Sequence, residues 1–110
     1  MGAECEVDYI HGMPALDCDA QAVSILERAA KAQLGEKRVA FLPRPSMGSE
    51  DFASYTYELP CAYLLLGAGT PNENPLYGKP MHNEKVVFNE DVLPLGAALH
   101  TWCALNWLSQ

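Results

Sequence analysis

Residues 61–67 read Cys-Ala-Tyr-Leu-Leu-Leu-Gly, a run of six apolar residues that ends at a glycine. A strand in the middle of a parallel sheet has this character, because helices cover both of its faces and leave no side for polar residues. Segments with helical patterns lie before and after the run. The stretch therefore predicts a central strand, and the alternation of strands with helices predicts an α/β fold.

Two further strands are expected upstream of this run. Residues 39–42 are short and apolar and end at Pro43-Arg44-Pro45, which cannot continue a ladder of backbone hydrogen bonds. Residues 4–10 alternate, with Cys5, Val7 and Tyr9 on one face and Glu4, Glu6 and Asp8 on the other. Such a period of two indicates a half-exposed antiparallel strand. No hairpin partner lies next to it in the sequence, so we expect its partner strand to lie upstream of residue 1.

The first helix is predicted to run to about Leu34. Either Asp17 or Asp19 can cap its N-terminus, and Val23, Leu26 and Ala30 supply part of its apolar stripe. Gly35 follows the last periodic residue and supplies the stop.

Two more helices are expected downstream. Ser49 can cap a short one that ends at Pro60, with acidic residues in its first turn. Asp91 can cap the last one, where Pro94 occupies the first turn and its missing N–H is not needed. The stretch between them, residues 70–80, contains three prolines and two asparagines and is predicted to be a long loop.

The composition excludes several classes of protein. The net charge of −7 argues against a nucleic-acid-binding surface, which needs a basic patch. No apolar stretch approaches the ~20 residues of a membrane span. The 4 cysteines are far apart and form no Cys-x-x-Cys pair, so a disulfide framework is not expected and we favour a cytoplasmic location.

Three segments in order resemble the M20 peptidases, specifically the branch of hippurate hydrolases and N-acyl amino acid amidohydrolases. The first is MGSEDF at residues 47–52 and the second is the apolar LLLG at residues 64–67. The third is MHN at residues 81–83, followed by FNEDVLPLGAA at residues 88–98. With a looser match at residues 9–17, the resemblance covers nearly the whole chain.

This resemblance implies a domain organisation. Enzymes of the family are several times longer, with an α/β catalytic domain interrupted by a lid, or dimerisation, domain, and this implies a homo-oligomer. By analogy, residues 1–14 would be the last lid strand and its junction, and residues 15–110 the C-terminal part of the Zn-peptidase-like catalytic domain. Most metal ligands and the general-base glutamate would then lie upstream. Whether Met1 is a natural start stays open.

His82 is the candidate metal ligand. In the resembling enzymes a histidine at this position closes a site for two divalent ions, zinc or manganese, that activate water and polarise the amide carbonyl. Without the resemblance, a lone histidine on a loop is usually a solvated side chain. One histidine cannot hold zinc, since such sites take three or four protein ligands. His11 and His100 are expected to be structural, so we expect this chain alone to bind no metal stably.

Gly48 and Ser49 are the candidate substrate-binding residues. Gly48 lets the backbone approach a ligand, and the resemblance places this loop beside the substrate pocket, where it would receive the substrate's carboxylate. The alternative is that Ser49 only caps a helix and that Glu50 and Asp51 only complement the helix dipole. Phe52 and Tyr55 are expected in the core rather than in a pocket.

Two functions therefore remain after the sequence is read. The first is that of an enzyme: part of a metal-dependent amidohydrolase that acts on N-acyl amino acids or small peptides, with no nucleic-acid or membrane partner. The second is that of a non-catalytic module that folds, associates with itself or a partner, and binds no metal usefully. A segment upstream that carries Cys, His and Glu ligands would favour the first.

Overall fold

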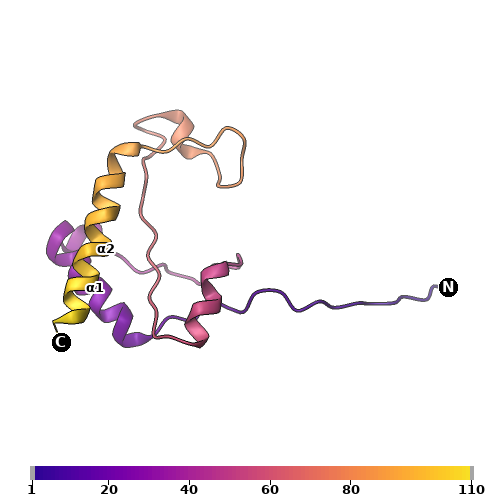
Figure 1. Ribbon diagram of the computed structural model, residues 1–110. Helices are drawn as coiled ribbons and strands as arrows, with labels where there is room; N and C mark the ends of the chain where they lie inside the picture. Colours follow the sequence, from indigo (N-terminus) through magenta and orange to yellow (C-terminus); the bar gives the residue numbers. More distant parts are fainter. Residues whose placement is uncertain (1, 110) are drawn as a thin grey trace.

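The computed structural model describes residues 2–109, and its regular structure is helical (Figure 1). Two α-helices dominate, α1 at Ala20–Leu34 and α2 at Leu93–Leu108. Short 3₁₀ helices occupy the connecting chain: η1 at Glu36–Arg38, η2 at Asp51–Tyr57, η3 at Pro75–Gly78 and η4 at Glu90–Val92. The order of the predicted helices is confirmed.

Helix α1 begins and ends at residues that the sequence identifies. The carboxylate of Asp19 accepts a hydrogen bond from the N–H of Ala22 at 2.8 Å, so Asp19 and not Asp17 is the N-cap. Gly35 ends the helix with a φ of 87°, which residues with a side chain rarely adopt. The N–H of Asp19 also donates to the carbonyl of Cys61 at 2.9 Å, which ties the start of α1 to the apolar run.

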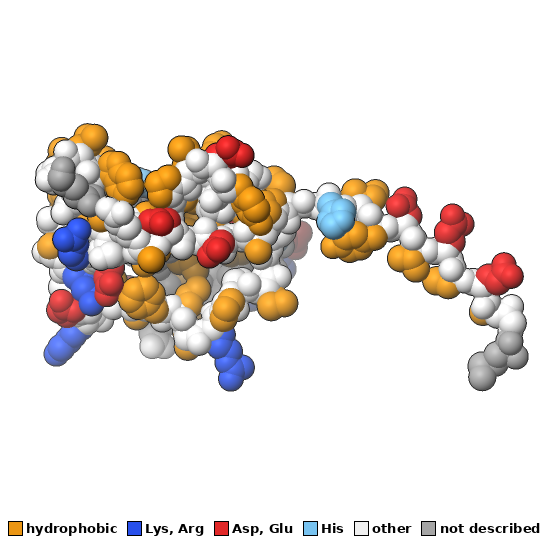
Figure 2. Space-filling model, turned by 90° about the horizontal axis from the view of Figure 1, so that it is seen from below, with side chains coloured by type: hydrophobic (Ala, Val, Ile, Leu, Met, Phe, Trp, Pro, Cys, Tyr) orange, Lys and Arg blue, Asp and Glu red, His pale blue; other side chains and the backbone are white. Residues whose placement is uncertain are grey.

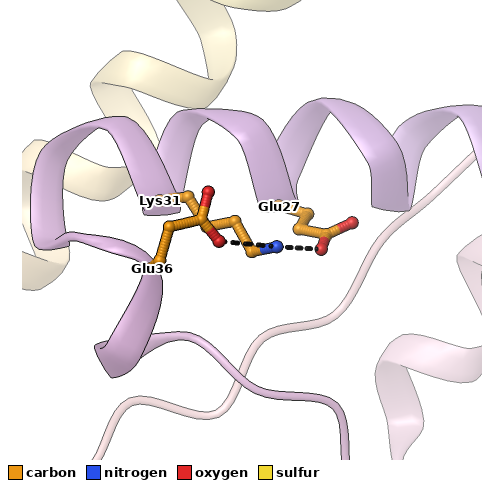
Figure 3. A network of polar contacts seen from close by, with 3 residues as sticks. All are labelled: Glu27, Lys31 and Glu36. Atoms are coloured by element: carbon orange, nitrogen blue, oxygen red, sulfur yellow. Dashed lines mark ion pairs between the residues drawn. The ribbon is translucent and has the colours of Figure 1, made fainter.

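A network of two ion pairs lies at the C-terminal end of α1 (Figure 3). The Lys31 ammonium lies 2.7 Å from Glu27, one turn earlier, and 3.1 Å from Glu36 in η1. Hydrogen bonds from Lys31, first to Glu27 and then to Glu36, raise the pKa of Lys31. The network links the end of α1 to the turn that follows it.

Helix α2 begins differently from the prediction. Asn89 accepts from the N–H of Asp91 at 2.9 Å and thereby caps η4, which continues into α2 through Val92 in helical conformation. Asp91 is therefore not the cap, because the chain is already helical before α2 starts. Pro94 does lie in the first turn, as predicted.

The core lies where α1 and α2 pack on each other (Figure 1). Three alanines of α1 are buried with Ile25 from the same helix and Leu99 from α2. Small side chains allow a close approach of the two helices, so little large apolar area is buried between them. Leu105, further along α2, stays 59% exposed.

The three predicted strands are not formed. Residues 4–10, 39–42 and 61–66 carry no strand, and no β-ladder is present in residues 2–109. A strand is defined by its hydrogen-bonded neighbour, and these segments have none within the described chain. The α/β class and the lid strand are thus not confirmed.

The chain is more open than a compact domain of its size. It exposes 9506 Å², whereas a folded monomer of 12.0 kDa exposes about 6,000 Å². Its radius of gyration is 18.4 Å, against about 13 Å for a compact chain of this length. Part of the excess is an N-terminal arm, residues 2–12, that stands away from the body with apolar and acidic side chains along it (Figure 2). In the described part of the chain, no helix is long and apolar enough to cross a membrane.

Candidate functional site

The loop at residues 68–89 carries His82 and is held closed at its base. The N–H of Asn89 donates to the carbonyl of Ala68 at 2.9 Å, and the same Asn89 caps η4. Directly after Ala68, at the start of the loop, Gly69 has a φ of 109°. A Cβ at this position would overlap the ring of Tyr77. The loop is therefore fixed to the N-terminal end of α2 despite its length.

His82 is exposed on this loop and has an unusual backbone. Its φ is 58°, the one positive value among the non-glycine residues of the described chain. Asn83 follows with a tight turn, in which its side chain accepts from Lys85 N–H at 2.9 Å and its carbonyl accepts from Val86 N–H at 3.0 Å. A histidine in the left-handed region is uncommon, and such conformations gather at functional sites.

The described residues do not assemble a metal site. No three His, Cys, Asp or Glu side chains lie close enough together in residues 2–109 to hold an ion. On the arm, the rings of His11 and Tyr9 meet edge to face, with their centroids 4.9 Å apart. His100 lies on α2. One imidazole falls short of the three or four protein ligands that zinc takes, so these residues alone do not fit the implied metal centre.

The predicted substrate loop is organised around Glu50. One oxygen of its carboxylate accepts from the N–H of Phe52 at 3.2 Å, and the other accepts from the hydroxyl of Tyr63 at 2.8 Å. Glu50, not Ser49, is thus the cap of η2, because its longer side chain folds back onto the first turn. Gly48 and Ser49 are exposed, and the N–H of Gly48 donates to the Ser46 hydroxyl at 3.2 Å.

The Tyr63–Glu50 hydrogen bond shifts the pKa of both groups. The bond from Tyr63, followed by that from Phe52 N–H and then by Asp51, lowers the pKa of Glu50. Reciprocally, the Glu50 acceptor raises the pKa of Tyr63. The rings of Phe52 and Tyr63 also lie 5.6 Å apart. The sequence reading missed this pair, although a tyrosine inside an apolar run signals a hydroxyl that needs a partner.

An apolar hollow of about 580 Å³ lies beside this pair. Its walls come from α1, α2, η2 and the run at residues 61–66, and they include Leu26, Phe52, Leu66, Leu99 and Trp107. Phe52 is half-buried in this wall, so it belongs to both the core and the hollow. Tyr55 was expected in the core but is 60% exposed, because it lies on the outer side of a helix with little more than two turns.

Comparison with known proteins decides the family. Residues 3–106 match the sequence profile of peptidase family M20/M25/M40. The chain belongs to this family. Among its relatives, a probable hydrolase of Synechocystis is 33% identical over 106 residues, which cover 96% of this chain and 26% of that protein. The hippurate hydrolase of Campylobacter jejuni is 38% identical over 88 residues, 80% of this chain and 21% of that protein.

The resemblance to M20 peptidases is therefore confirmed. This M20 chain spans about a quarter of the length of its Synechocystis and Saccharolobus relatives. Thermostable carboxypeptidase 2 of Saccharolobus solfataricus is 28% identical over 106 residues, again 96% of this chain and 26% of that protein. No solved structure matches the chain. The roles of Gly48, Ser49 and His82 stay predictions.

Proposed function

We propose that this M20 chain is the C-terminal part of a metal-dependent amidohydrolase that cleaves the amide bond of N-acyl amino acids or small peptides. The family match over residues 3–106 carries the proposal. Relatives named as a hippurate hydrolase, as carboxypeptidases and as IAA-amino acid hydrolases support the choice of substrate class, since each name denotes cleavage of an amide or peptide bond.

His82 is the residue through which this chain would contribute to a metal centre. Zinc or manganese in such a centre supplies an activated water and polarises the carbonyl of the amide. The remaining ligands and the general base would come from a companion segment of the same enzyme. The closed loop base and the left-handed backbone of His82 support a held rather than a freely moving imidazole.

Ser49 is the proposed contact for the substrate's carboxylate, and Gly48, which has no side chain, would let the ligand approach the backbone beside it. The start of η2 does not offer a free anion site, because the Glu50 carboxylate occupies the N–H of Phe52. The Ser49 hydroxyl is exposed and can donate a hydrogen bond to a ligand. The contact is therefore a hydrogen bond from a side chain, not an interaction with a helix dipole.

In the assembled enzyme, residues 4–10, 39–42 and 61–66 would become strands beside strands of the companion segment. Residues 1–14 would close the lid domain and residues 15–110 the catalytic α/β domain. The exposed apolar surface of this chain supports such a companion. By analogy with the family, the lid domain would mediate a dimer. The 4 cysteines are unpaired, which agrees with a cytoplasmic enzyme.

A chimera tests the proposal. In the Campylobacter hippurate hydrolase, the segment that matches this chain is replaced by this chain, and hydrolysis of hippurate and bound metal are measured. We expect turnover, and we expect His82→Ala to abolish most of it and to lower the metal content. His100→Ala is the matched control and should keep both. A folded chimera in which His82→Ala retains full turnover would show that another residue has the role.

The rival function is a non-catalytic module that associates with itself or a partner. The large apolar exposure of the isolated chain favours it for the 110-residue form. We expect this form alone to release no amino acid from hippurate, because it has one candidate ligand and no base. Metal-stimulated turnover that His82→Ala removes would contradict this expectation.

A further inference from the structure

The Glu50 carboxylate has both oxygens engaged by partners on two different segments. Phe52 N–H in η2 binds one oxygen at 3.2 Å, and the Tyr63 hydroxyl, 13 residues along the chain, binds the other at 2.8 Å. The second bond is a charge-assisted one from a hydroxyl to a carboxylate, which is stronger than a bond between neutral groups. Together they fix the direction in which this charge points.

That direction matters because Ser49 is the residue immediately before Glu50. Without its two partners, the Glu50 side chain could adopt rotamers that bring its carboxylate close to a carboxylate bound at the Ser49 hydroxyl. Two like charges at that distance repel each other, even in a solvent-like dielectric. The Glu50 carboxylate must therefore be held away from Ser49 if the Ser49 hydroxyl is to bind the carboxylate of a ligand.

We propose that Tyr63 is a positioning residue, which draws the Glu50 carboxylate towards the apolar run and leaves Ser49 free to bind the carboxylate of an N-acyl amino acid. The inference rests on the proposed function, and it assigns neither Tyr63 nor Glu50 a catalytic role. The contact of 5.6 Å between the rings of Phe52 and Tyr63 supports the geometry, since it holds the phenol beside η2.

The pKa shifts define the pH range of the pair. The pKa of Glu50 is lowered, so the charged acceptor is present at and above the ordinary carboxyl range and is lost only as the pH falls through the lowered value. The pKa of Tyr63 is raised, so the donor persists above the ordinary tyrosine range. Asp51, the neighbouring carboxylate, acts on both members. The pair should thus be intact across neutral pH, and ligand affinity should be flat there.

The first measurement establishes the pair in the 110-residue chain. Tyr63 is titrated by NMR with labelled tyrosine in the wild type and in Glu50→Gln. We expect the pKa of Tyr63 to fall towards its ordinary value in the variant. An unchanged titration would overturn the pair itself.

The second measurement tests its role, with hippurate as the probe and the amide signals of Ser49 and Glu50 as the readout. We expect Tyr63→Phe to weaken hippurate binding about three- to fivefold, the effect of one released like charge nearby. The double variant Tyr63→Phe/Glu50→Gln should recover affinity to within about twofold of the wild type, because no charge is left to repel the ligand. Tyr55→Phe is the control: its ring also lies 5.6 Å from Phe52, but its hydroxyl takes no part in the pair.

The outcomes separate the two proposals. If the double variant binds as weakly as Tyr63→Phe, the tyrosine only supports the fold and the positioning role is wrong. If hippurate moves no signal at Ser49 in the wild type, the substrate contact proposed above is wrong, and the role of Tyr63 falls with it.

Discussion

His82 has the most unusual backbone conformation of any side-chain-bearing residue in the described chain. A φ of 58° costs a residue with a Cβ about 1–2 kcal/mol relative to the ordinary regions, and glycine escapes this cost. The hydrogen bonds around Asn83 and Asn89 hold the loop in this form. The side chain of His82 is thus exposed, as a metal-ligating residue needs to be, and its backbone conformation is fixed by the loop.

Replacing His82 separates backbone strain from side-chain contacts. His82→Ala should change the free energy of unfolding by less than about 0.5 kcal/mol, since an exposed imidazole contributes little to packing. His82→Gly should be more stable than His82→Ala by about 0.5–1 kcal/mol, because it relieves the left-handed conformation. Urea unfolding measures the difference. Equal stabilities for the two variants would mean that the loop relaxes without strain.

At the scale of the elements, the N-terminus of α1 allows a matched test. Asp19→Ala removes the acceptor of the Ala22 N–H and should cost about 1 kcal/mol of unfolding free energy. Asp17→Ala, two residues earlier and outside the helix, should be close to neutral. Helix content from circular dichroism during urea unfolding reports both. A larger loss for Asp17→Ala would mean that the helix begins earlier than Ala20.

The helices were predictable and the strands were not, for a physical reason. The Gly35 stop, Pro94 and an aspartate cap before α1 act through neighbours within a few residues, so the sequence contains most of the signal. It left Asp17 and Asp19 open, however, and the predicted caps Ser49 and Asp91 were wrong, since Glu50 and Asn89 cap η2 and η4. A strand at residues 61–66 depends on a partner that can lie anywhere in the chain or beyond it. The same distinction applies to the candidate site: motif context predicts His82 as a metal ligand, which stays a prediction, whereas the Tyr63–Glu50 bond joins residues that only the fold brings together.

At the scale of the whole molecule, exposed apolar surface is the dominant feature. The chain exposes 9506 Å² in total, and the excess over the roughly 6,000 Å² of a compact monomer is larger than the roughly 1,600 Å² that a standard interface buries. Many large apolar side chains, such as Leu65 and Leu108, are among the exposed residues. Backbone groups of residues 61–66 also lack a strand partner in the described chain. Both conditions favour pairing between copies.

The isolated chain should therefore self-associate, and more strongly as salt is added. Its charge of −7 opposes association, and salt at physiological ionic strength screens that charge over about 8 Å. Analytical ultracentrifugation at low and high salt should show dimers or larger species that increase with salt. A single monomeric species at both would mean that the chain covers its apolar faces by itself.

The N-terminal arm also determines which peptide bonds a protease reaches first. Val7 is 80% exposed and Tyr9 75%, and an extended exposed backbone fits a protease cleft without local unfolding. A glutamate-specific protease should therefore cut after Glu4 and Glu6 before it cuts the body of the molecule. Trypsin should spare the arm altogether, because Arg28, the first lysine or arginine of the sequence, lies inside α1. Brief digestion with the two enzymes, followed by mass spectrometry, would distinguish a free arm from one that a second copy or a companion segment protects.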